Sequence, residues 1–172
     1  MNPQRPNIIY ILGDDHRADY LGCAGHEVLR TPNLDQLARE GTRFTHAFCT
    51  SPACTPSRAS HYTGQWERRH GVNFNSHSNL MPEAWEGSFP MRLKEAGYFI
   101  GWVGKNHVPV GGGRNGYDSG YLEGAFDYWY GNHNHSGFYP KEQGGGRIYR
   151  NAKADTQIEI FTEAVRDFLQ PN

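Results

Sequence analysis

The chain has 172 residues, of which 37% are hydrophobic and 13% aromatic, so one globular domain with a buried core is expected and disordered or fibrous classes are excluded. Its 17 basic and 18 acidic residues nearly cancel and form no long block of one sign, which argues against nucleic acid or an anionic membrane as a partner. The three cysteines match the spacing of neither a zinc site nor a disulfide framework. At least one thiol is therefore expected to be free.

The N-terminal third contains signals for two strands and a helix. Residues 7–12 form an apolar run ended by Gly13, which predicts a buried central strand. This run is much too short for a signal sequence or a membrane span. Thr31 is a good N-cap residue before a proline and Gly41 supplies a stop signal, which predicts a surface helix between them. The alternation in residues 43–48 predicts a second strand.

The middle of the chain predicts two further helices and a strand. Thr55 and Ser88 are good N-cap residues, and Gly64 and Gly97 supply the matching stop signals. The stretch between these helices is polar and predicts irregular structure. Residues 98–103 predict a strand that follows the second helix at once.

The C-terminal third predicts a long loop region and one helix. Residues 104–151 are rich in glycine, asparagine and aromatic side chains, which is typical of long loops, and such loops are usually functional. Thr156 and Glu159 form a capping box ahead of an apolar face, and Pro171 follows its end. Strands that alternate with helices predict an α/β fold with a mainly parallel sheet and helices on both faces. No internal repeat or linker divides the sequence.

Two adjacent carboxylates follow the first predicted strand. Asp14 and Asp15 would lie at the carboxyl edge of the sheet, with Gly13 permitting a sharp turn. A pair of hard oxygen ligands suits a divalent cation such as calcium or magnesium. The alternative is a polar loop with a helix-capping aspartate, which an isolated Asp-Asp pair favours.

A cysteine and an arginine mark the start of the second predicted helix. If Thr55 caps this helix, Cys54 lies just ahead of its N-terminus, where free N–H groups and the helix dipole favour an anion. Arg58, one turn further on, adds a guanidinium suited to oxyanions. These residues indicate a nucleophile beside an oxyanion site, whereas a lone cysteine would more simply be a small buried residue.

A lysine and a histidine follow the strand at residues 98–103. Lys105 can neutralise an oxyanion, and His107 can move protons near neutral pH. Taken singly, each residue is better explained as a solvated lysine or a structural loop histidine. The topology nevertheless predicts that this cluster and the aspartate pair meet at one edge of the sheet.

These clusters together resemble the type I, formylglycine-dependent sulfatases of the alkaline-phosphatase-like superfamily. The run C-T-P-S-R from Cys54, followed by T-G at Thr63, is similar to the family signature C-x-P-S-R. The aspartate pair occupies the place of two metal ligands in that family, and Gly-Lys-x-His from Gly104 is similar to its third block. Residues 31–44 are also typical of it, and the resemblance covers most of residues 7–107.

The resemblance implies an alkaline-phosphatase-like fold in which residues 1–172 are the N-terminal part of a sulfatase catalytic domain. It also implies that the fold is incomplete at the C-terminus, because the family takes further metal ligands, a lysine and a histidine from sequence beyond Asn172. The remaining catalytic domain and the C-terminal subdomain would then be absent from this chain. Because these further residues are missing, the chain would be either an inactive, truncated remnant or a protein that forms an oligomer or associates with the missing portion.

The family's chemistry implies a sulfuric ester hydrolase that releases inorganic sulfate. A separate formylglycine-generating maturation enzyme would oxidise Cys54 to formylglycine. Asp14, Asp15 and the modified Cys54 would hold Ca²⁺, with Mg²⁺ as a second option.

The remaining roles come from the same resemblance. Arg58 and Lys105 would hold the modified residue and the sulfate oxygens, and His107 would assist proton transfer. A phosphonate or phosphate ester hydrolase of the same superfamily is the close alternative.

The substrate is expected to be a sulfated small molecule or glycan, with a carbohydrate sulfate favoured. Aromatic residues in the predicted loop region could stack on sugar rings, although packing against the core explains them more simply. These residues are Phe126, Tyr128, Trp129, Tyr130, Phe138 and Tyr139. His133 and His135 are expected in an exposed polar loop. Neither a nucleic acid nor a membrane partner is indicated, and the compartment stays open: cytoplasmic as sequenced, or periplasmic or secreted if a leader was removed.

Overall fold

The computed structural model describes residues 5–76, 78–112, 121–133 and 154–170. Its contacts divide the chain into an N-terminal unit, Met1–Phe48, and a C-terminal unit, Cys49–Asn172. The sequence shows no linker at residue 48 and does not predict this division. Within the described residues, none of the helices combines the length and the apolar character needed to cross a membrane.

The N-terminal unit contains a short 3₁₀ helix, η1 (Gly22–Ala24), and one α-helix, α1 (Pro32–Glu40). Thr31 is the N-cap residue of α1 and Gly41 is its C-cap residue, so the predicted surface helix is confirmed at both ends. Its proline occupies the first turn, where the missing N–H costs nothing.

A small polar network joins η1 to α1. The Thr31 hydroxyl accepts a hydrogen bond from the Gly22 backbone N–H at 2.8 Å and donates one to Asp35 Oδ1 at 2.8 Å. The Cys23 backbone N–H also donates to Asp35 Oδ1, at 2.7 Å. The hydrogen bond from Thr31 is the largest of the effects that lower the pKa of the Asp35 carboxyl. The network fixes the loop before α1 in place of a side-chain cap.

The prediction of two strands in the N-terminal unit is wrong. Residues 7–12 and 43–48 are not β-strands in the structure, and Ile11 is 78% exposed. No described residue from Arg5 to Phe48 is buried. An apolar run becomes a strand only when a neighbouring strand pairs with its backbone groups, and the described part of this unit contains none.

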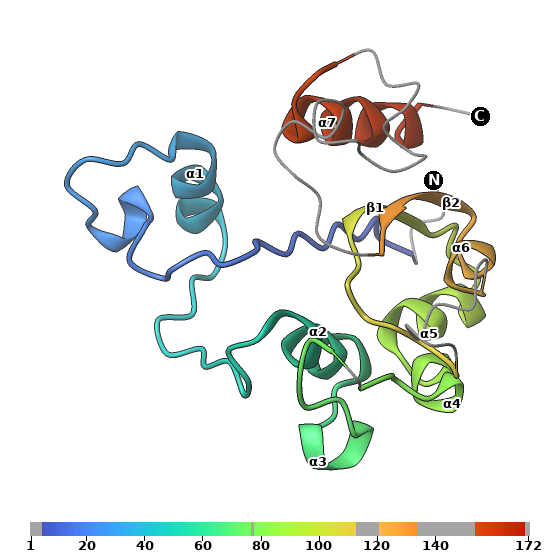
Figure 1. Cartoon of the computed structure of the whole chain (residues 1–172). Helices are drawn as coiled ribbons and strands as arrows, with labels where there is room; N and C mark the ends of the chain where they lie inside the picture. Colours follow the sequence, from blue (N-terminus) through green and yellow to red (C-terminus); the bar gives the residue numbers. More distant parts are fainter. Residues whose placement is uncertain (1–4, 77, 113–120, 134–153, 171–172) are drawn as a thin grey trace. The chain divides into compact units, whose positions relative to one another are not determined.

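The C-terminal unit alternates short helices with two strands (Figure 1). Its elements in chain order are α2 (Cys54–Thr63), α3 (Glu67–His70), α4 (Pro82–Glu86), α5 (Phe89–Glu95), β1 (Gly101–Lys105), α6 (Tyr121–Ala125), β2 (Tyr128–Asn132) and α7 (Gln157–Phe168). β1 and β2 pair in parallel, in a register that places Gly101 opposite Tyr128 and Lys105 opposite Asn132. The parallel pair and its helices confirm the predicted α/β class.

Aromatic side chains form the centre of the C-terminal unit. Tyr62 of α2 and Trp85 of α4 are both almost completely buried and meet edge to face, with ring centroids 6.0 Å apart. Tyr62 makes a second edge contact with Trp102 of β1 at 5.3 Å. Such contacts add to the burial of apolar area, so these rings tie α2 to both α4 and the sheet.

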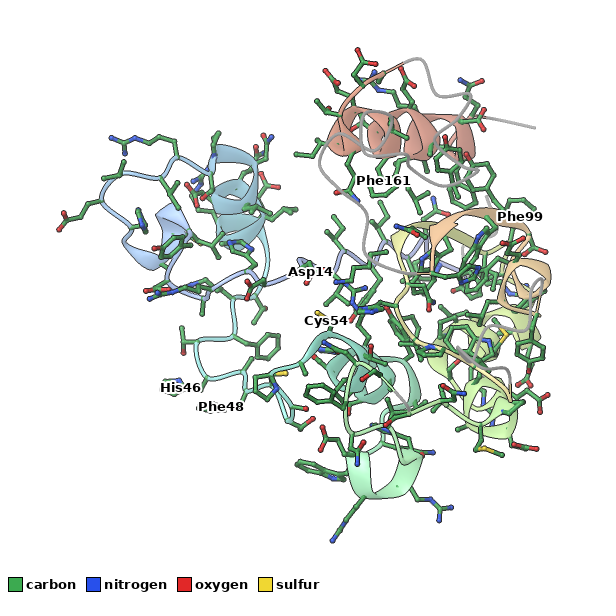
Figure 2. All side chains as sticks on the ribbon, in the orientation of Figure 1. Asp14, His46, Phe48, Cys54, Phe99 and Phe161 are labelled. Atoms are coloured by element: carbon green, nitrogen blue, oxygen red, sulfur yellow. The ribbon has the colours of Figure 1, made fainter. Side chains whose placement is uncertain are left out.

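The last helix, α7, packs on the sheet (Figures 1 and 2). Phe161 points from α7 toward Gly104 of β1, whose φ of 97° is in the left-handed region. Phe168 lies so close to Gly101 that a Cβ built there would come within 2.5 Å of the Phe168 ring. Two glycines of β1 therefore allow the helix to approach the strand. The capping box that starts α7 at Thr156 is confirmed.

Several predicted boundaries shift in the C-terminal unit. The strand predicted at 98–103 is observed as β1, Gly101–Lys105. The predicted loop region 104–151 contains α6 and β2 in its described part. The helix expected after Ser88 is confirmed, although the Ser88 hydroxyl makes no capping bond.

Candidate active site

Cys54 is the first residue of α2 and is partly buried. Ala53, in an extended conformation with φ −121° and ψ 147°, is the N-cap residue, so the prediction that Thr55 caps this helix is wrong. The Thr55 N–H instead donates to the Asn75 side-chain oxygen at 2.9 Å. Cys54 therefore lies within the first turn, where the helix dipole still favours an anionic group.

Arg58 joins α2 to the end of β1. Its guanidinium donates a hydrogen bond to the Lys105 backbone carbonyl at 2.7 Å and to the Tyr62 hydroxyl at 3.3 Å. Arg58 is only 6% exposed. Its hydrogen bonds are therefore shielded from water and come from a charged donor, which makes them stronger than neutral hydrogen bonds at the surface. This bond spans 47 positions of the sequence and brings the second and third predicted clusters together.

Buried hydrogen bonds fix the conformation of the turn after β1. Asn106 is completely buried, its backbone N–H donates to the Asn132 carbonyl at 2.8 Å, and its side-chain oxygen accepts from the Val108 N–H at 2.8 Å. The next residue, His107, is buried and has a φ of 52°. A histidine in the left-handed region is held there by its surroundings at some cost in energy. The hydrogen bonds of Asn106 thus fix the backbone from which the Lys105 and His107 side chains extend.

Asp14 and Asp15 belong to the N-terminal unit, whereas Cys54 belongs to the C-terminal unit. Both aspartates are exposed, and Asp15 has a φ of 53°, which fits the sharp turn predicted after Gly13. The structure thus brings Cys54, Arg58, Lys105 and His107 into one unit. The expected meeting with the aspartate pair stays a prediction.

The sequence model of the sulfatase family matches residues 6–172. The chain belongs to the sulfatase family. It is 40% identical to human arylsulfatase D over 140 residues, which cover 76% of this chain and 23% of that protein. The N-acetylglucosamine-6-O-sulfatase of Bacteroides thetaiotaomicron is 30% identical over 182 aligned positions, 98% of this chain and 29% of that enzyme. The ulvan-active sulfatase of Formosa agariphila is 39% identical over 127 residues, 74% of this chain and 24% of that enzyme.

The matches confirm the predicted family and its alkaline-phosphatase-like fold. This sulfatase chain spans from less than a fifth to about a third of the length of the curated relatives it matches.

The donor chemistry of the aspartate pair fits a divalent cation of the kind that the sulfatase family implies. Carboxylate oxygens are the ligands that calcium and magnesium prefer, and Asp14 and Asp15 supply two such groups side by side. Among the residues that the structure describes, no group of three or more His, Cys, Asp or Glu side chains is close enough to hold a metal ion. The pair would therefore be one part of a larger ligand set.

The aromatic residues of the predicted loop region pack within the unit. Phe126 is buried, and its ring centroid lies 5.4 Å from that of Trp102 and 5.3 Å from that of Trp129. The Tyr128 hydroxyl donates to the Ala164 carbonyl at 3.1 Å, and burial raises its pKa to about 12. The simpler explanation, packing against the core, is confirmed for these residues. Phe138 and Tyr139 lie outside the described residues.

His133 is not the exposed loop residue that the sequence predicts. It is partly buried, its ring stacks on Trp129 with centroids 5.2 Å apart, and its Nε2 lies 3.3 Å from a carboxylate oxygen of Glu123. His135 lies outside the described residues.

His70 is a further buried histidine, whose spacing from the neighbouring histidines fits no metal motif in the sequence. Its Nδ1 accepts from the Val72 N–H at 3.1 Å, so the proton of the neutral ring is on Nε2, which lies 2.9 Å from the Ser60 hydroxyl. Burial is the main cause of a lowered pKa for His70. The neutral ring thus links α2 to the end of α3. A buried polar link of this kind leaves no pattern in the sequence.

Proposed function

We propose that this chain contributes the nucleophile and anion-binding residues of a sulfuric ester hydrolase that releases sulfate from a sulfated carbohydrate. The observation that carries the proposal is the bond from Arg58 to the Lys105 carbonyl. It holds the first turn of α2, with Cys54, against the turn that carries Lys105 and His107. A nucleophile position, two cationic side chains and a proton carrier then lie in one compact unit.

Formylglycine derived from Cys54 would supply the attacking oxygen, and a divalent cation, when bound at Asp14 and Asp15, would stabilise negative charge on that oxygen. Other residues of the chain would bind the sulfate group and move the proton. Arg58 and Lys105 bind and orient the sulfate oxygens, since guanidinium and ammonium groups donate charge-assisted hydrogen bonds to oxyanions. His107, in its constrained turn, holds or moves a proton at the leaving oxygen.

The carbohydrate part of the proposal is supported by the relatives. The N-acetylglucosamine-6-O-sulfatase aligns with nearly the whole of this chain, and the ulvan-active sulfatase with about three quarters of it. Arylsulfatase D matches 76% of the chain and the murine steryl-sulfatase 62%, so both align with less of it than the N-acetylglucosamine-6-O-sulfatase does. The buried aromatic side chains around Phe126 give this assignment no support, because they are occupied within the core.

The proposal predicts a specific modification. The chain is produced together with a formylglycine-generating enzyme, its thiols are alkylated, and the cysteine-containing peptides are analysed by mass spectrometry. Cys54 should appear as the aldehyde and escape alkylation. Cys23 and Cys49, which are also free cysteines, are matched controls in the same sample and should be alkylated. An alkylated Cys54 in a sample where a known substrate of the enzyme is converted would contradict the proposal.

A further inference from the structure

The first turn of α2 has no capping side chain of its own. Its N-cap residue is Ala53, which makes no side-chain capping bond. The hydroxyl of Thr55 is buried and has no hydrogen-bond partner among the described residues, so it does not cap the helix either. The next residue, Pro56, has no N–H group. The turn that begins with Cys54 (Figure 2) therefore depends on a partner from elsewhere in the chain.

Asn75 supplies that partner. Its side-chain oxygen accepts a hydrogen bond from the Thr55 backbone N–H at 2.9 Å, across 20 positions of the sequence. The first N–H groups of a helix have no acceptor within the helix, and a side-chain oxygen that accepts from one of them stabilises the helix as an N-cap residue does. Asn75 is partly buried, so this bond is partly shielded from water.

The chain is anchored on both sides of Asn75. On one side, Val72 is completely buried, and its N–H donates to Nδ1 of His70, whose ring also contacts α2. On the other side, Leu80 is completely buried, and its N–H donates at 2.7 Å to the carbonyl of Pro109, just beyond the turn after β1. These contacts restrict how far Asn75 can move relative to α2.

We propose that Asn75 is a positioning residue of the candidate active site. It holds the first turn of α2, and with it the nucleophile position at Cys54, through the Thr55 backbone N–H. A displacement of about 1 Å at a reacting group can cost about a hundredfold in rate, so a fixed first turn favours the attack. Arg58 joins α2 to the Lys105 carbonyl, and Asn75 secures the same helix from a second segment of the chain.

The inference deepens the proposed function and rests on it for the role of Cys54 as the nucleophile. The bond between Asn75 and α2 rests on the structure alone. The sequence gives no signal for this bond, because Asn75 lies in a polar stretch where the pattern predicts only irregular structure.

The test measures how fast the Cys54 thiol of the folded chain reacts with iodoacetamide, followed by mass spectrometry. At about pH 9.5 a thiol of ordinary pKa is mostly ionised, so the rate reports access to the thiol. Cys54 is partly buried, and opening of the first turn would expose it. Asn75→Leu has a similar volume but no acceptor, and it should raise the Cys54 rate about fivefold, as expected for loss of a cap.

Three comparisons control this result. Asn75→Asp keeps an acceptor oxygen and should stay within about twofold of the wild type. Asn73→Leu is the matched control, because Asn73 lies in the same segment and accepts from the Ser78 hydroxyl; it should also leave the Cys54 rate within about twofold. Cys23, in the N-terminal unit, is the internal control in every sample. Asn75→Ala removes the acceptor without a new apolar side chain and replaces the leucine variant if that variant does not fold.

A folded variant without the Asn75 acceptor whose Cys54 rate does not rise would overturn the proposal. Equal increases in Asn73→Leu and Asn75→Leu would also overturn it, as would an equal increase at Cys23 or an Asn75→Asp chain that reacts as fast as Asn75→Leu.

The two proposals fail separately. A Cys54 rate that depends on Asn75, in a chain whose Cys54 is never converted to formylglycine, would keep the contact and remove the proposed catalysis. Conversion of Cys54 with an unchanged rate in Asn75→Leu would do the reverse.

Discussion

Replacement of Arg58 by lysine tests the contact that joins the two halves of the candidate site. The guanidinium donates to the Lys105 carbonyl at 2.7 Å and to the Tyr62 hydroxyl at 3.3 Å, and the side chain is almost fully buried. A lysine ammonium has no planar fork and cannot reproduce both bonds from the same position. Loss of one hydrogen bond from a charged donor costs about 1.5–3 kcal/mol, and the weaker bond adds to this. We expect the free energy of unfolding to fall by about 2–3 kcal/mol.

Urea denaturation followed by tryptophan fluorescence measures this loss. All four tryptophans lie between residues 66 and 129, so the signal reports the C-terminal unit alone. With a urea dependence of about 1–3 kcal/mol per molar, the midpoint should fall by about 0.7–3 M. Arg69→Lys, at an exposed position on α3, is the control and should change stability by less than about 0.5 kcal/mol. Equal midpoints for the two variants would refute the role assigned to Arg58.

Three further predictions concern the packing and titration of the C-terminal unit. Gly101→Ala places a Cβ within 2.5 Å of the Phe168 ring, and the resulting overpacking should cost about 1–3 kcal/mol in the same urea experiment; a neutral effect would show that α7 does not rest on β1. Thr156→Ala removes the capping box of α7 and should cost about 0.5–2 kcal/mol, whereas an unchanged helical circular dichroism and midpoint would contradict a stabilising cap. His70 has a lowered pKa caused mainly by burial, so the native state binds fewer protons than the unfolded state. The contribution of the neutral His70 ring to stability is therefore present above the ordinary histidine pKa of about 6.5 and is lost as pH falls through the native pKa. His70→Gln should therefore show a smaller loss of stability than the wild type between neutral and mildly acidic pH, and equal losses would argue against His70 as the titrating group.

Helices were the part of the fold that the sequence predicted best, because their signals are local. The capping box at Thr156, the N-cap at Thr31 and the glycine stop signals at Gly41 and Gly64 all depend on residues within one or two turns. The start of α2 was misplaced because Thr55 has the right side chain for a cap but is buried, and its N–H is bound by a distant asparagine, Asn75.

Strands were predicted less well, since a strand depends on a partner elsewhere in the chain. Residues 7–12 have a strong apolar pattern and no partner strand among the described residues. Tyr128–Asn132 contains a glycine and an asparagine, which disfavour strands, yet it is a strand because β1 pairs with it. The candidate site shows the same limit. The motifs identified Cys54, Arg58, Lys105 and His107, but the Arg58 bond to Lys105 joins residues 47 positions apart and could not be read from either motif.

Sulfate release tests the central claim most directly. The chain, produced with a formylglycine-generating enzyme, and its Cys54→Ala variant are compared on N-acetylglucosamine 6-sulfate and 6-phosphate, with released sulfate and phosphate measured by ion chromatography. The account predicts sulfate release that depends on Cys54 and exceeds phosphate release. Equal sulfate release by Cys54→Ala or a preference for the phosphate ester would contradict it.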